Sequence, residues 1–266
     1  MRVSIQSRLH YHFDQAADVL LAVEALDLPE QVIVRDELTM HPNIERRDVL
    51  GGGGDQRGKW LRAEGELEIS YSALVDVKRI VRDLHGLSKV PLHELSAEVT
   101  RYIFPSRYCE SDRLEGIAIE TFGHLSGGSQ ISAVADWVFN HLDYVPGASN
   151  SNTSAADTFM SRRGVCRDYA HLFISFARAL GVPARMVSVY APGIDPPDFH
   201  AIADVWLDGA WQLVDPSRMA DVSHVVRIAS GRDATDISFM TIFGTAQLLN
   251  QSVDARPAEP LPSPQL

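Results

Sequence analysis

The sequence predicts an α+β fold, because strand-like and helix-like patterns occupy separate parts of the chain. Residues 65–77 alternate apolar and polar side chains, the period-two pattern of a strand with one buried face. Residues 165–180 instead carry apolar side chains at helical spacing. Strands lie before and after the helical part, so we expect sheets segregated from the helices.

Two domains and a tail are expected. Residues 1–85 are predicted to form a β-rich N-terminal domain, as an antiparallel sheet or sandwich with a flexible turn at Gly51–Gly54. This domain carries no recognisable chemistry, so we expect a scaffold or a surface that docks substrate. Residues 86–250 are predicted to form the second domain. Residues 251–266 are rich in proline and are predicted to be a disordered tail.

Composition excludes several function classes. A net charge of −11 argues against nucleic-acid binding, and no apolar run is long enough for a membrane span. The first residues lack the apolar segment of a signal peptide, so a cytoplasmic location with both cysteines reduced is expected. Two cysteines and scattered histidines make a poor zinc site, and neither a metal nor another cofactor is expected.

Cys166 is predicted to lie in the first turn of a helix over residues 165–180. Gly181 fits the position after the last helical turn, and Pro183 prevents the helix from continuing. The first-turn N–H groups and the helix dipole favour a thiolate, which is the nucleophilic form of cysteine. The main-chain N–H of Cys166 is also placed to stabilise an oxyanion.

The thiol needs a base from elsewhere in the chain. Asp168 lies in the same turn and mildly opposes a thiolate, so the helix alone is a poor activator. His171 lies five residues after Cys166, roughly 140° around the helix, and is rejected because it points away.

Three strands after the helix offer His200 and Asp215. Residues 185–190, 200–207 and 210–215 are predicted strands, and Asp208-Gly209 is a hairpin turn. A two-residue turn places Asp215 opposite Ile202, with His200 as its diagonal neighbour on the same face. We therefore expect Asp215 to reach the imidazole of His200.

Each of these residues also has an ordinary structural interpretation. Cys166 alone resembles a buried helical cysteine, His200 a hydrogen-bonded strand histidine, and Asp215 a strand-end residue before a proline. Cys109 is expected to be structural. A thiol redox protein is disfavoured because the chain has no Cys-x-x-Cys motif. Only the combination of the three residues points to catalysis.

The combination resembles the bacterial transglutaminase-like family of cysteine proteases. The resemblance covers about residues 130–220, and residues 1–85 look like the β-rich domain that precedes the core in bacterial members. The matching segments are Gly164-Val-Cys-Arg-Asp-Tyr-Ala-His171, Gly181-Val-Pro-Ala-Arg185, His200-Ala201, Trp211 and Asp215-Pro216, with a further stretch at Gly231–Asp236.

The resemblance implies a papain-like catalytic triad within a transglutaminase-like core. Cys166 would be the nucleophile, His200 the base and acid, and Asp215 the residue that orients His200. Tyr144 would be a candidate side-chain donor to the oxyanion, since the family places such a donor upstream of the cysteine. The sequence departs from the family in the strand after His200, where Ile202 replaces a tryptophan and Asp204 a glutamate.

The predicted activity is acyl transfer through a thioester on Cys166. Water as the acceptor makes a peptidase or amidase, and an amine makes a transglutaminase; hydrolysis is favoured because no acceptor-lysine site is recognisable. A non-catalytic binding scaffold that retains the fold is the competing hypothesis. A peptide or protein substrate is the expected partner, and the sequence does not indicate an oligomeric state.

Overall fold

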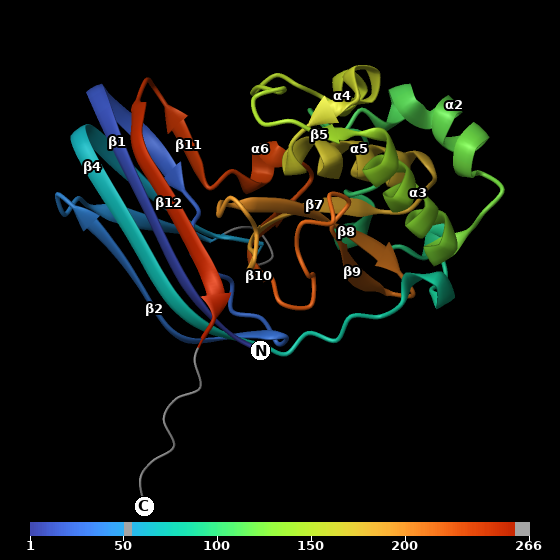
Figure 1. Cartoon of the computed structure of the whole chain (residues 1–266), viewed down its shortest axis with the longest axis horizontal. Helices are drawn as coiled ribbons and strands as arrows, with labels where there is room; N and C mark the ends of the chain where they lie inside the picture. The colour runs from blue at the N-terminus through green and yellow to red at the C-terminus, as the bar shows by residue number, and fades with distance from the viewer. Residues whose placement is uncertain (51–54, 259–266) are drawn as a thin grey trace, which may run out of the picture.

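Among the described residues, two larger antiparallel sheets, a two-stranded parallel sheet and a layer of helices form the fold. The computed structural model describes residues 1–50 and 55–258, so the predicted turn at residues 51–54 lies outside the described residues. Figure 1 shows the larger sheet on the left and the smaller sheet, with helices above it, on the right. The predicted α+β class is confirmed.

The larger sheet, here the N-terminal sheet, is built on a long pair of strands, β1 and β4. Their apolar side chains alternate with polar ones, and residues such as Ile5, Leu9 and Ile69 are almost fully buried on one face. The strand order is β11-β1-β4-β2, with β12 also on β1 and β3 also on β4. The bounds are β1 Arg2–Leu21, β2 Gln31–His41, β3 Arg46–Leu50, β4 Arg57–Val77, β11 Met240–Phe243 and β12 Gln247–Pro257.

The C-terminal residues correct the predicted disordered tail over 251–266. Residues 251–257 belong to β12, which pairs antiparallel with β1 from Val3↔Pro257 to His12↔Gln247. Val253 is buried in this sheet. The rest of the predicted tail, from residue 259, lies outside the described residues. The sheet assigned to the N-terminal domain therefore takes two of its strands from the other end of the chain.

The smaller sheet, here the core sheet, carries the helices on one face. Its strands have the order β10-β7-β8-β9 and are β7 Ala184–Tyr190, β8 His200–Leu207, β9 Ala210–Val214 and β10 Val226–Gly231. The helices are α1 Ala97–Thr100, α2 Ser111–Phe122, α3 Gly127–His141, α4 Ala155–Ser161, α5 Cys166–Ala179 and α6 Ala234–Ile237. Short segments complete the list: η1 Leu84–Gly86, η2 Leu92–Glu94, and the two-residue strands β5 Asp143–Tyr144 and β6 Arg163–Gly164.

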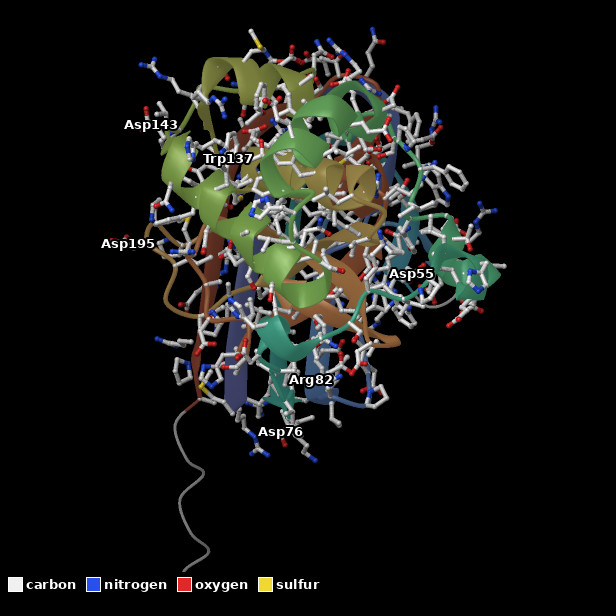
Figure 2. All side chains as sticks on the ribbon, turned by 90° about the vertical axis from the view of Figure 1, so that its right-hand side faces the viewer. Asp55, Asp76, Arg82, Trp137, Asp143 and Asp195 are labelled. Carbon is white, nitrogen blue, oxygen red and sulfur yellow. The ribbon has the colours of Figure 1, made fainter. Side chains whose placement is uncertain are left out.

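Helix α5 is the centre of the core, because it is buried on almost every side. Phe173 and Phe176 on α5 are fully buried. Trp137 on α3, labelled in Figure 2, meets the ring of Phe176 edge-on at 5.4 Å. A helix enclosed by other helices and a sheet is held rigidly, so its first turn is a fixed platform for chemistry.

Tyr190 joins the two sheets. It ends β7, is fully buried, and donates from its hydroxyl to the main-chain oxygen of Val23 at 2.7 Å. Its ring stacks on Tyr71 of β4 at 6.1 Å, within an apolar cluster shared by both sheets. The core sheet therefore rests directly on the N-terminal sheet.

Candidate active site

Cys166 is the first residue of α5, as the helical spacing predicts. Val165 precedes it in an extended conformation, and the Val165 N–H donates to the Asp168 carboxylate at 2.8 Å. The Ser149 hydroxyl donates to the same carboxylate oxygen at 2.5 Å. Asp168 is fully buried, and its carboxylate caps the N-terminus of the helix that carries Cys166.

Gly164 is required by this cap. A Cβ added to Gly164 would lie 2.5 Å from the Cβ of Asp168. No side chain fits there without moving either the cap or the loop. The glycine before the cysteine motif is therefore explained by close packing against Asp168.

His200 and Asp215 form a buried hydrogen-bonded pair. The distance from His200 Nε2 to Asp215 Oδ2 is 2.9 Å, and the two residues are 3% and 8% exposed. A carboxylate only accepts, so Nε2 carries the hydrogen and Nδ1 is left for Cys166. The expected contact between Asp215 and the His200 ring is confirmed.

The loop after β9 fixes the Asp215 carboxylate. Ser217 donates to Asp215 Oδ1 from its main-chain N–H at 2.9 Å and from its hydroxyl at 2.6 Å. The Ala220 N–H donates to Oδ2 at 2.8 Å. Burial opposes ionisation, but these donors and His200 hold the pKa of Asp215 below its usual value.

The surroundings of His200 favour its protonated form. Burial alone would lower the pKa of His200, but hydrogen bonds with Asp215 and Cys166 and the charges of both raise it to about 10. An imidazolium is therefore stabilised between a carboxylate and the Cys166 thiol. This is the charge arrangement in which a cysteine acts as a nucleophile.

Tyr144 lies beside Cys166. It pairs with Gly164 through the short parallel ladder of β5 and β6, two residues before the cysteine. Burial and then the adjacent Cys166 raise the pKa of the Tyr144 phenol to about 12, so the phenol keeps its proton at neutral pH. Tyr144 as a whole is 40% exposed, and its protonated hydroxyl is a hydrogen-bond donor next to the thiol.

His171 serves a different part of the structure. It is fully buried, its ring stacks on Tyr108 at 5.1 Å, and its Nε2 accepts from the Ala234 N–H at 3.2 Å. Burial lowers the pKa of His171 to about 3. A neutral histidine committed to these contacts supports its rejection as the base.

Cys109 is buried away from solvent. Both cysteines are free, and Cys109 has no exposed surface. Burial raises the pKa of the Cys109 thiol to about 12. It is therefore an internal control against which the reactivity of Cys166 can be measured.

A cleft of about 510 Å³ opens over Cys166 and His200. One wall comes from the core, with Met186 and Ser188 of β7 and Phe199 before β8. Another wall comes from residues within 234–242, which belong to α6, to β11 and to the segment between them. Sequence reasoning missed this wall, because its apolar residues after 237 gave no clue to where they would pack.

Asp204 anchors the strand that carries His200. It is fully buried and accepts from the two terminal guanidinium nitrogens of Arg227 at 2.6 and 3.0 Å and from Nε of Arg185 at 3.0 Å. Burial opposes ionisation, but the two arginines lower the pKa of Asp204. The aspartate that departs from the family pattern therefore ties β8 to β7 and β10.

The comparisons with known proteins agree with this geometry. The pattern of the transglutaminase-like superfamily core matches residues 120–216. The solved structure of a "putative cysteine protease" from Cytophaga hutchinsonii is 35% identical, with a TM-score of 0.90, over 98% of this chain and 93% of that one. The chain belongs to the transglutaminase-like superfamily, as the resemblance predicts.

Curated relatives are more distant. An uncharacterized protein of Mycobacterium leprae is 26% identical over 186 residues, which is 65% of this chain and 66% of that protein. An uncharacterized protein of Mycobacterium bovis is 29% identical over 120 residues, which is 39% of this chain and 38% of that protein. The chain thus matches less than two thirds of the length of these relatives. Among the described residues, no helix is long and apolar enough to cross a membrane.

Proposed function

We propose that the protein is a cysteine-dependent hydrolase, a peptidase or amidase that acts through a thioester on Cys166. The observation that carries the proposal is the buried pair of His200 and Asp215, joined at 2.9 Å, in the same cleft as a cysteine in the first turn of a helix. The proposed substrate is a peptide or protein, whose carbonyl group enters the cleft over Cys166.

In the first half-reaction the Cys166 thiolate attacks the carbonyl carbon. The carbonyl oxygen becomes an oxyanion, which accepts from the Cys166 main-chain N–H and from the Tyr144 hydroxyl. As the intermediate collapses, the bond to nitrogen breaks and the His200 imidazolium gives its proton to the leaving amine or ammonia. A thioester and a neutral His200 remain.

In the second half-reaction neutral His200 takes a proton from water. The resulting hydroxide attacks the thioester carbonyl, the bond to sulfur breaks, and the carboxylic acid leaves while Cys166 returns as a thiolate. Asp215 keeps the His200 ring in one orientation and stabilises its charge in both halves.

Two other functions use the same structure. A transglutaminase differs only in the second half-reaction, where an amine replaces water. A binding scaffold would keep the fold without turnover. The buried, fully hydrogen-bonded Asp215 favours catalysis over the scaffold, because a scaffold gains nothing from a charged histidine beside a cysteine.

Product analysis distinguishes the three functions. Unfolded casein is incubated with the protein and a fluorescent primary amine, with Cys166→Ala as the matched blank. Hydrolysis predicts peptide fragments, or free ammonia without incorporated amine, from the wild type alone. Incorporation of the fluorescent amine with one ammonia released per amine and no peptide fragments would identify a transglutaminase, and identical results for wild type and Cys166→Ala would favour the scaffold.

A further inference from the structure

β11 is an edge strand in the wall of the active-site cleft. Among the described residues its only strand partner is β1, with the register Leu21↔Met240 to Asp18↔Phe243. Met240, Thr241 and Ile242 line the cleft together with Cys166 and His200. The side of β11 away from β1 therefore faces the space in which the thiol reacts.

The register shows which main-chain groups point into this space. The Ala22 N–H donates to the Phe239 carbonyl at 2.8 Å, so Phe239 directs its main-chain groups towards β1. In an antiparallel ladder alternate residues do the same, which assigns Thr241 and Phe243 to β1. Met240 and Ile242 then direct their N–H and C=O groups to the open edge.

Of the four main-chain groups of Met240 and Ile242 at the open edge, one has a local partner. The Ser238 hydroxyl donates to the Met240 carbonyl at 2.7 Å, which leaves that oxygen one lone pair. The Met240 N–H and both main-chain groups of Ile242 are not paired within the sheet. An unpaired edge of this kind is a template for another extended chain.

We propose that β11 binds the substrate as an added β-strand, so that an extended peptide main chain is held beside Cys166. The inference rests on the proposed function and narrows its substrate class. It selects an unfolded or flexible polypeptide segment over a small amide, because only a segment of several residues can pair with both Met240 and Ile242. It also gives the N-terminal sheet a role, since β1 holds β11 rigid from behind.

Edge pairing has a period of two along the peptide. Every second residue of an added strand turns its N–H to β11, and the residues between turn theirs away. Blocking a paired N–H removes one hydrogen bond, which corresponds to about a fivefold loss. Blocking an unpaired N–H costs nothing in the ladder.

The test compares two kinds of thiol label on the full chain. The peptidyl probe is N-acetyl-tetraalanyl chloromethyl ketone, with analogues that carry a single N-methyl group at each alanine in turn. Iodoacetamide is the reference label without a main chain. The ratio of the two labelling rates at Cys166 isolates recognition of the main chain from reactivity of the thiol.

The matched variants are Ile242→Pro and Ile242→Val. Proline removes the Ile242 N–H, and valine keeps it with a similar side chain. We expect N-methylation to lower the rate ratio about fivefold or more at alternate alanines only. We expect Ile242→Pro to lower the ratio for the unmodified probe to a similar extent, and Ile242→Val to retain it.

Equal tolerance of N-methyl groups at all positions, or an unchanged ratio in Ile242→Pro, would overturn the β11 inference. Neither result bears on the triad, because the iodoacetamide rate is measured separately. Conversely, slow iodoacetamide labelling would count against the proposed function, while the rate ratio would still be defined and would still judge β11.

Discussion

Asp215 sets the charge of His200 through one short hydrogen bond. Its carboxylate is itself held by Ser217 and Ala220, so the carboxylate cannot turn away without breaking their contacts. The imidazole is therefore fixed in one orientation, with its Nε2 bound to Asp215.

Asp215→Asn tests how far the charge of His200 depends on Asp215, because it replaces one carboxylate oxygen with an NH2 group. The change removes the negative charge with little change in size, so we expect the pKa of His200 to fall by about one or more. NMR titration of the His200 ring measures it. Asp221→Asn is the control, since Asp221 is exposed, lies on the same loop after β9, and binds Ser223 with its carboxylate. A His200 pKa that is the same in Asp215→Asn and wild type would refute the role of Asp215.

The charge of His200 also predicts how stability depends on pH. Its pKa is about 10 in the folded protein and 6.5 in an ordinary environment, so the folded state binds the proton more tightly. The stabilisation is fully present below about pH 6.5 and is lost as pH rises through about 10. Urea unfolding across this window should show a loss of at least about 1 kcal/mol. The loss of unfolding free energy between these pH values should be smaller in His200→Ala than in the wild type. Equal losses in the two proteins would contradict a raised pKa of His200.

At the scale of elements, the N-terminus of α5 depends on close packing before the cysteine. Gly164 leaves room for Asp168, which caps the helix and binds Ser149. Gly164→Ala should cost about 1–3 kcal/mol in the free energy of unfolding, because the added methyl group overlaps the cap. Gly116→Ala is the control; Gly116 lies in α2 with nothing within 4 Å of an added Cβ, and this change should be neutral or slightly stabilising. Equal effects of the two changes would contradict the packing account.

Local patterns predicted the elements that carry the candidate triad. Helical spacing and the glycine and proline after residue 180 placed α5, and the Asp208-Gly209 turn fixed the pairing Leu207↔Ala210. That pairing brings Asp215 to His200. These features were predictable because each depends on residues close together in the chain. The Asp204 ion pairs with Arg185 and Arg227 were not, because they join three strands of the core sheet.

At the scale of the whole molecule, both ends of the chain build the N-terminal sheet. Sequence reasoning missed β12, because its residues are mostly polar and its prolines suggested a tail. An edge strand with a single buried residue gives little period-two signal, and only its partner β1 determines its structure. The wall of the cleft at residues 234–242 was missed for a different reason, because its apolar residues do not show which part of the molecule they pack against.

Val253→Ala tests the contribution of β12. Val253 is the buried residue of the strand, at 5% exposure, and losing two carbons there should cost about 2 kcal/mol in the free energy of unfolding. Leu249→Ala on the same strand is the control, because Leu249 is 43% exposed and should lose little. Urea denaturation compares the two. A larger loss in Leu249→Ala would show that β12 does not pack as described.

If His200 activates Cys166, the pH dependence of thiol alkylation at Cys166 depends on the His200 ring. Wild type and His200→Ala are treated with iodoacetamide from about pH 5 to pH 9, and mass spectrometry reads Cys166 and Cys109 separately. We predict that Cys166 labels rapidly near about pH 6 in the wild type and at least about tenfold more slowly in His200→Ala. In the wild type, Cys166 should label faster than Cys109 at every pH. A Cys166 that labels no faster than an ordinary thiol, or at the same rate without His200, would contradict the account.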